Sequence, residues 1–335
     1  MTRALITGIT GMVGSHLADY LLAETDWEID GLIRWRSPLE NVEALVPLAN
    51  RGERVRFLYG DLKDGESLRQ CVRESWPDYV FHLAAQSYPG TSFKSPCDTL
   101  DTNVQGTVRL LDAIKEFAPK AWVHVCSSSE VYGKVAHHLT PIREDCPFHP
   151  ASPYAISKVG TDLTARFYAE AYGMNIITTR MFTHTGPRRG DVFMESSFAK
   201  QIAMHEALGV AGVVKVGNIR SIRTVADVRD AVRAYHMALT VNPQAGEVYN
   251  IGGDYTTSVS NVLHTLFGMT DHPSDWSYNL DPARLRPVDA DNQIPDCSKF
   301  KNHTGWEPTI KFEHTMRDLL DWWRNRVKTS SHLIR

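Results

Sequence analysis

The fold is decided by an N-terminal stretch that reads Ala4-Leu5-Ile6-Thr7-Gly8-Ile9-Thr10-Gly11-Met12-Val13-Gly14. Its first three residues predict a short buried strand, and the glycines that follow are spaced Gly-x-x-Gly-x-x-Gly. An amphipathic helix is expected next, through Leu17, Leu21 and Leu22. Glycines at this spacing allow a tight turn and let a pyrophosphate approach the backbone at the helix N-terminus. Because they stand between a strand and a helix, they predict a dinucleotide-binding unit.

Strands and helices alternate over the first half of the chain. We expect further strands at 28–33, 55–60, 79–83, 121–126 and 175–180. Helices are expected from Gly65 to Glu74, from Asp101 onward, and from Tyr154 to Tyr172. This alternation predicts an α/β fold with a right-handed, doubly wound parallel sheet of the Rossmann type.

The alternation weakens beyond residue 180. Helices at 195–208 and 227–240 and short strands near 214–217 and 247–251 predict a smaller C-terminal α/β lobe. Such a lobe would close over the carboxyl ends of the strands and hold a substrate. We therefore expect a dinucleotide-binding domain at 1–180 that also carries the catalytic residues. Residues 181–330 are expected to bind mainly substrate, with some segments returning to the first domain.

Composition excludes several classes of function. A chain of 335 residues with 42% hydrophobic and 22% charged residues has ordinary globular values. The net charge of -3 gives no case for binding nucleic acid or an anionic membrane. The five cysteines have no regular spacing, so we expect reduced thiols and no metal site. The chain shows no signal peptide and no apolar run of about 20 residues, which together favour a cytoplasmic location.

The second expected strand ends in the segment Arg34-Trp35-Arg36-Ser37. Sites for NAD usually carry an acidic residue near this point, which holds the ribose 2′-hydroxyl. Arg34, Arg36 and Ser37 instead suit a 2′-phosphate, so the sequence favours NADP over NAD. The alternative interpretation is a solvated basic loop.

Small residues follow the fourth expected strand, in Leu83-Ala84-Ala85-Gln86-Ser87. They would let the cofactor lie across the carboxyl ends of the strands. Asn103, near the start of the next helix, is expected to be an internal hydrogen-bonding brace with a structural role.

The candidate catalytic residues lie between Ser127 and Lys158. Tyr154 and Lys158 are four residues apart, which on a helix places both side chains on one face. A nearby ammonium stabilises a phenolate, so a phenol with an ordinary pKa of about 10 could act as a base near neutrality. Ser128 follows a predicted strand, where its hydroxyl could reach the same reacting oxygen, and Glu130 lies two residues further on. An isolated Tyr-x-x-x-Lys pattern is usually a solvated helix face, but here it follows a dinucleotide-binding motif and a serine-rich strand end.

Many segments resemble those of one family. They are GITGMVGSHLADYLL, RWRS, YGDL, HLAAQS, SSSEVYG, HPASPYAISK, GPRRGDVF, KVGN, RTVADVRD and LRPVD. Together they resemble the extended short-chain dehydrogenase/reductase family, and within it the GDP-mannose 4,6-dehydratases. The most telling pieces are Ser-Glu-Val-Tyr-Gly at 129–133, Gln-Ser at 86–87 and Pro-Arg-Arg-Gly at 187–190. The segments at 197–203, 215–218 and 285–287 also resemble GDP-4-keto-6-deoxymannose reductases.

The resemblance implies roles for individual residues. Tyr154 would take the proton of the 4-hydroxyl, Lys158 would lower the tyrosine pKa and hold the nicotinamide ribose, and Ser128 would bind the C4 oxygen. Glu130 would take the C5 proton and help to expel the C6 hydroxyl. Further implied contacts are Asp61, Leu62, His184 and Arg189 for NADP, Ser87 for the sugar, and Lys200, Arg223 and Arg286 for the GDP portion.

Two positions depart from the dehydratase pattern. Ser128 stands where these enzymes usually have threonine, and the hydroxyl is kept. Thr183 stands where they usually have asparagine, which leaves open a modified sugar such as a heptose in place of mannose. A 4-keto reductase or epimerase, and a redox-sensing binding protein without catalysis, are the other hypotheses.

The resemblance also bears on assembly. Relatives form dimers through two long helices, here about 100–117 and 153–172, and some form tetramers through the basic loop at Arg34–Ser37. We therefore expect a homodimer or a homotetramer.

Overall fold

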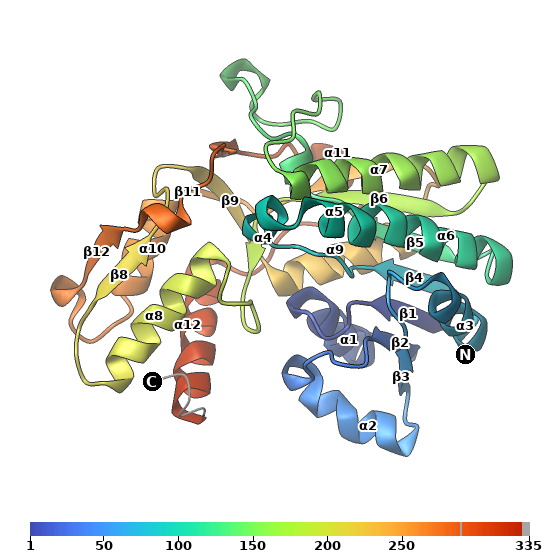
Figure 1. Ribbon diagram of the computed structural model, residues 1–335, viewed down its shortest axis with the longest axis horizontal. Coiled ribbons are helices and arrows are strands. Elements are labelled where there is room, and N and C mark those ends of the chain that lie inside the picture. The colour runs from blue at the N-terminus through green and yellow to red at the C-terminus, as the bar shows by residue number, and fades with distance from the viewer. Residues whose placement is uncertain (289, 330–335) are drawn as a thin grey trace.

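A seven-stranded parallel sheet forms the centre of the molecule (Figure 1). The computed structural model describes residues 1–288 and 290–329, so Asp289 of the LRPVD segment lies outside the described residues. The sheet has the order β10-β6-β5-β4-β1-β2-β3. Its strands are β1 (Arg3–Thr7), β2 (Glu28–Ile33), β3 (Val55–Tyr59), β4 (Tyr79–His82), β5 (Trp122–Cys126), β6 (Ile176–Met181) and β10 (Val248–Ile251). This order confirms the predicted doubly wound sheet.

The strand order reverses between β1 and β4. From β1 the chain builds outward through β2 and β3, and then crosses to build β4, β5 and β6 on the other side. The loops at the carboxyl ends of β1 and β4 therefore diverge, which opens a crevice where ligands bind in sheets of this kind. The candidate site lies there.

Helices cover both faces of the sheet. On one face α1 (Met12–Glu24) and α9 (Val228–Thr240) share an apolar core that includes Leu17, Leu21 and Ala231. On the other face α3 (Gly65–Ser75), α6 (Gly106–Phe117) and α7 (Pro153–Tyr172) share a core that includes Leu68 and Leu110. Burial on both faces accounts for the continuous apolar strands read from the sequence.

One predicted helix start is wrong. The helix expected to begin at Asp101 starts at Pro96, as α5 (Pro96–Leu100), and continues through a π-helical turn (Asp101–Gln105) into α6. Proline suits the first turn of a helix because its missing N–H has no helical partner there. The π turn contains Asn103, whose side chain is bonded internally as expected, to Gln86 and Ser157.

The C-terminal half builds a smaller part beside the large sheet, on the left of Figure 1. Its core joins α8 (Met194–Ala207), α10 (Val259–Phe267) and α12 (Phe312–Thr329). Its strands are β7 (His184–Thr185), β8 (Val213–Val216), β9 (Ile222–Asp227), β11 (Tyr255–Ser258), β12 (Ser277–Leu280) and β13 (Asn292–Gln293). From the same half, α9 packs on α1 and β10 pairs with β6 in the large sheet.

The remaining α-helices of the described residues are short connecting pieces. They are α2 (Val46–Arg51), α4 (Pro89–Lys94) and α11 (Ser298–Thr304). Among the described residues, no helix has the length and apolar character that crossing a membrane requires.

Candidate active site

A cavity of about 1170 Å³ lies at the carboxyl ends of the central strands, and loops from the smaller part complete its lining. It brings together nearly all of the predicted site residues. Those in its lining are Gly8, Thr10, Gly11, Met12, Val13, Gly14, Arg34, Ser37, Asp61, Leu62, Leu83, Ala84, Ala85, Gln86, Ser87, Ser128, Glu130, Tyr154, Lys158, Thr183, His184, Arg189, Arg223 and Arg286. Arg36 and Lys200 are the two predicted residues outside the lining.

The glycine loop after β1 forms a cradle that side chains would fill. Gly8 has a φ of +76°, and a Cβ there would lie 2.8 Å from the amide nitrogen of Ala84. A Cβ on Gly14 would lie 2.3 Å from the carbonyl oxygen of Gly8. The N-terminus of α1, at Gly11, is without a side-chain cap among the described residues. The backbone amides of this first turn can therefore bind a pyrophosphate.

In the segment after β2, only one of the two arginines that the sequence suggested for a 2′-phosphate lines the cavity. The amide of Ser37 donates to the carbonyl of Arg34 at 3.0 Å, which closes a turn. Trp35 and Arg36 form the exposed tip of this turn. Arg34 and Ser37, at its base, line the cavity, whereas Arg36 does not.

His184 and Arg189 line the cavity and are both partly buried. Burial, together with the charge of Arg189, lowers the pKa of His184 to about 4, so the ring is neutral at pH 7. Its Nδ1 lies 3.0 Å from the carbonyl oxygen of Phe182, to which a neutral ring can donate. Arg189 is partly exposed, but its Nε is buried and has no hydrogen-bond partner among the described residues. A buried, unsatisfied guanidinium N–H beside an uncapped helix fits an anionic cofactor.

Tyr154 and Lys158 lie one turn apart at the start of α7, as predicted. Ser152 caps this helix by accepting the amide of Ala155 at 3.0 Å. The Tyr154 and Lys158 side chains are both buried and line the cavity. Lys158 Nζ donates to the carbonyl oxygen of Cys126 at 2.7 Å. The helix α7 is thereby attached to the end of β5.

The predicted lowering of the Tyr154 pKa by Lys158 is not observed. Burial has the largest effect and raises the pKa of Tyr154 well above its ordinary value, and the charge of Glu130 adds to the rise. A hydrogen bond to Ser128 and the charge of Arg189 act in the opposite direction. Burial also lowers the pKa of Lys158 itself. In this structure the ammonium donates to the Cys126 carbonyl, and Lys158 is not among the groups that shift the pKa of Tyr154.

Glu130 and Ser128 belong to one short segment after β5. Ser128 caps the 3-10 helix η3 (Ser129–Val131), and its Oγ accepts the amide of Glu130 at 3.2 Å. The Glu130 carboxylate lies 4.0 Å from the guanidinium of Arg286. The cavity therefore holds a carboxylate, a phenol, a hydroxyl and an ammonium, which can together move protons at two positions of one substrate.

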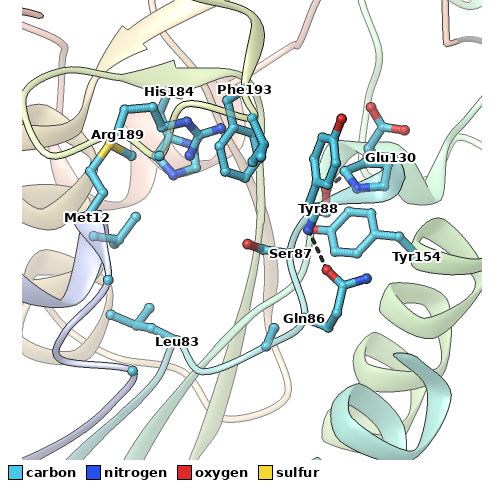
Figure 2. A pocket seen from close by; sticks show the side chains of 18 of the residues that line it. Met12, Leu83, Gln86, Ser87, Tyr88, Glu130, Tyr154, His184, Arg189 and Phe193 are labelled. Carbon is cyan, nitrogen blue, oxygen red and sulfur yellow. Dashed lines mark hydrogen bonds between the residues drawn. The ribbon is translucent and has the colours of Figure 1, made fainter. Parts of the chain in front are cut away.

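Two aromatic residues of the site were not predicted. The rings of Tyr88 and Phe193 meet edge to face with centroids 5.9 Å apart, and both line the cavity. Figure 2 shows Tyr88 on the side of Glu130 and Tyr154, and Phe193 on the side of His184 and Arg189. The Arg189 guanidinium lies 3.6 Å from the centre of the Phe193 ring. No spacing pattern marks either residue, because their contact joins two loops in which Tyr88 and Phe193 are 105 residues apart.

Lys200 serves another contact in the structure. Its ammonium pairs with Asp191 at 2.6 Å and lies 5.4 Å from the centre of the Trp323 ring. Asp191 belongs to the loop that carries Arg189 and Phe193, and lines the cavity itself. Lys200 therefore contacts this loop through Asp191 without lining the cavity.

Residues 5–319 match the family model described as GDP-mannose 4,6 dehydratase. The chain belongs to this family. It is 32% identical to a GDP-mannose 4,6-dehydratase of Yersinia enterocolitica, over 96% of this chain and 93% of that protein. It is also 32% identical to a GDP-6-deoxy-D-mannose reductase of Pseudomonas aeruginosa, over 97% of this chain and 98% of that one.

A solved structure agrees with this membership. RMD of Pseudomonas aeruginosa, in complex with NADPH, is similar with a TM-score of 0.82 and 30% identity. The similarity covers 98% of this chain and 100% of that one. The predicted family is thus confirmed, and with it a nicotinamide-dependent class of enzyme that acts on nucleotide sugars.

Proposed function

We propose that this protein is a GDP-mannose 4,6-dehydratase that uses NADP and makes GDP-4-keto-6-deoxy-D-mannose. The observation that carries the proposal is the presence of Glu130 in the same cavity as Ser128, Tyr154 and Lys158. A 4-keto reductase needs a proton donor for one oxygen, and Tyr154 with Lys158 suffices for that. A dehydratase needs a second acid–base group for C5 and C6, and Glu130 can supply it.

Different residues of the site act at C4 of the sugar and at C5 and C6. NADP, when bound, would supply the hydride acceptor for C4 and the hydride donor for C6. Tyr154 takes the proton of the 4-hydroxyl, Ser128 donates a hydrogen bond to the oxygen that becomes the ketone, and Lys158 orients the ribose and favours the phenolate. The ketone acidifies the C5 proton, which Glu130 removes. Glu130 then delivers a proton to the C6 oxygen, which leaves as water, and a proton returned to C5 completes the product.

NADP is favoured over NAD by the end of β2. Arg34 and Ser37 line the cavity at the point where a ribose 2′-phosphate would lie, and a guanidinium suits a phosphate. For the nucleotide, Arg223 and Arg286 line the cavity and supply charge for a diphosphate. Lys200 is left out of this set because it pairs with Asp191.

Mannose is the sugar we favour, and a manno-heptose is the alternative that Thr183 keeps open. A 4-keto reductase remains the second candidate function, because a relative with that name is as similar as the dehydratase. We also propose a cytoplasmic location, since all five cysteines are free thiols.

We further propose that two copies of the chain associate through α7. Ile156, Leu163 and Phe167 recur on one face of this helix and are about half exposed. An apolar stripe of this kind on a surface helix usually meets a partner. Light scattering of wild-type protein and of Phe167→Glu tests this: we expect a dimer and a monomer, respectively, and a monomeric wild type would contradict it.

The proposed reaction is tested by Glu130→Gln, which removes the acid–base group and keeps the shape. With GDP-mannose, the variant should lose turnover by about 10²-fold or more. Turnover at the wild-type rate would remove Glu130 from the mechanism. Retention of GDP-4-keto-6-deoxymannose reduction in the variant, with no dehydration by the wild type, would favour the reductase.

A further inference from the structure

A buried ion pair lies behind the active site, and the proposed mechanism does not use it. The guanidinium of Arg180 binds the carboxylate of Asp162 through two hydrogen bonds, at 2.8 and 3.0 Å. Both side chains are almost completely buried, at 2% and 0% exposure. Burial of two charges is unfavourable unless good geometry and further hydrogen bonds offset the lost hydration. The stability of this ion pair therefore depends on the contacts that surround it.

Asp162 belongs to the catalytic helix. It follows Lys158 by four residues on α7, so it lies one turn further along the same face as Tyr154 and Lys158. Arg180 lies in β6, the strand next to β5, which delivers Ser128 and Glu130. The ion pair therefore fixes the catalytic helix against the central sheet.

The other end of the Arg180 guanidinium reaches the segment of Glu130. Its Nη1 donates to the hydroxyl of Tyr132 at 2.9 Å and to the carbonyl of Glu144 at 2.7 Å. The Tyr132 hydroxyl in turn donates to Asn250 Oδ1, in β10, at 2.7 Å. The guanidinium also lies 5.3 Å from the centre of the Tyr132 ring. Tyr132 is thus held by two strands of the sheet.

The local hydrogen bonds of Glu130 stay within its own short segment, from its amide to Ser128 Oγ at 3.2 Å and from the Gly133 amide to its carbonyl at 3.1 Å. Glu130 lies in η3, a 3-10 helix of three residues, and helices this short are not stable alone. Tyr132 ends this helix, is completely buried, and is two residues from Glu130. A second tie is the hydrogen bond from the His149 amide to the carbonyl of Val131, at 3.1 Å. The position of the Glu130 carboxylate therefore depends on how firmly Tyr132 is anchored.

We propose that Asp162, Arg180 and Tyr132 are positioning residues that hold Glu130 in register with Tyr154 and Lys158. They connect the helix that carries the phenol and ammonium to the segment that carries the carboxylate. The inference rests on the proposed role of Glu130 in removing the C5 proton. It assigns none of the three residues a contact with substrate.

The proposal separates the two halves of the reaction. Proton removal from the 4-hydroxyl depends on Tyr154 and Lys158, which α7 holds directly. Elimination across C5 and C6 depends on Glu130, which the network holds through Tyr132. Weakening the Tyr132 anchor should therefore slow elimination and leave oxidation at C4 nearly unchanged.

Tyr132→Phe tests this because it removes one oxygen and keeps the ring. Tyr168→Phe is a matched control: Tyr168 is also a buried tyrosine, on α7, and its hydroxyl bonds to Asp112 at 3.0 Å, away from Glu130. With GDP-mannose we expect Tyr132→Phe to lower kcat by about 10- to 100-fold, with KM changed little. The near-ultraviolet absorbance of the bound cofactor should rise and persist, because the ketone forms faster than it eliminates. Tyr168→Phe should turn over like the wild type.

A readout without substrate checks the structural half of the claim. Amide hydrogen exchange at residues 129–133 should accelerate in Tyr132→Phe and stay unchanged in Tyr168→Phe. Arg180→Lys, which cannot make the paired hydrogen bonds, should show the same pattern more strongly. Should Arg180→Lys fail to fold, Tyr132→Phe still decides the matter.

The outcomes distinguish this inference from the proposed function. If Tyr132→Phe and Tyr168→Phe show equal kcat and equal exchange at 129–133, the positioning role is wrong. If oxidation and elimination slow by the same factor in Tyr132→Phe, the network supports the site as a whole and the claim of selective positioning is wrong. If Glu130→Gln itself dehydrates GDP-mannose normally, the proposed function fails first.

Discussion

The guanidinium of Arg286 lies 4.0 Å from the carboxylate of Glu130, so a residue of the smaller part of the fold faces the candidate acid–base group. Both residues line the cavity. A diphosphate bound in this cavity would compete with the carboxylate for the same positive charge. Binding of substrate is therefore expected to weaken the contact between Arg286 and Glu130.

This relationship predicts the effect of Arg286→Gln. The KM for GDP-mannose should rise by about 10- to 100-fold, because one charge-assisted contact to the diphosphate is lost. Lys200→Gln is the matched control, since Lys200 pairs with Asp191 and lies outside the lining. Steady-state kinetics of both variants check this. Equal KM values for the two would contradict the placement of the diphosphate.

The cofactor preference predicts a contrast between two neighbouring arginines. Arg34→Gln should weaken NADP binding by about tenfold or more and leave NAD binding nearly unchanged. Arg36→Gln should affect neither, because Arg36 lies at the exposed tip of the turn. Calorimetric titration of both variants with both cofactors provides the measurement. A larger loss in Arg36→Gln would mean that the turn rearranges when the cofactor binds.

Lys158→Met should change both the rate and its pH dependence. Burial raises the pKa of Tyr154, and a phenolate base forms only as the pH rises toward that pKa. The proposed mechanism has Lys158 favour the phenolate in the occupied site, so without the ammonium the acidic limb of kcat/KM should move to higher pH and kcat at pH 7 should fall by about 10²-fold or more. A pH–rate profile of the variant and the wild type measures this shift. An acidic limb at the wild-type position would show that Lys158 does not act on the ionisation of Tyr154.

Buried histidines should make the protein less stable in mild acid. Burial lowers the pKa of His82 and of His124 to about 3. Between pH 6.5 and about 3 the unfolded chain binds protons at these sites and the folded protein does not, so stability falls as the pH falls. The loss is about 2 kcal/mol per histidine at pH 5.

His124→Gln measures one of these contributions. Its urea-derived free energy of unfolding should change less between pH 7 and pH 5 than that of the wild type, by about 2 kcal/mol. Gln can still bond to Thr179, the present partner of His124 at 2.8 Å. His272→Gln, at an exposed histidine, should keep the wild-type slope. An unchanged slope in His124→Gln would place the acid sensitivity elsewhere.

The sequence was sufficient for the parts of the site that local patterns determine. The glycine spacing after β1 and the four-residue spacing of Tyr154 and Lys158 both depend on one strand–helix turn or one helix, so their placement could be predicted. The parallel sheet followed from the alternation of strands and helices.

The rest depends on contacts between distant segments. Arg34 and Arg36 are equivalent in sequence, and only the turn closed by Ser37 decides which of them faces the cavity. Lys200 could not be distinguished from a substrate contact without its partner Asp191. The direction of the Lys158 ammonium was missed for the same reason, because its acceptor is a backbone carbonyl 32 residues away.

The most direct test of the central claim is to incubate the purified protein with GDP-mannose in deuterated water, without added cofactor, and to follow the sugar by NMR and mass spectrometry. We predict loss of one water, a 4-keto-6-deoxy product that carries deuterium at C5, and no net change in NADPH. Absence of reaction with GDP-mannose, together with consumption of NADPH in the presence of GDP-4-keto-6-deoxymannose, would contradict the account and identify a reductase.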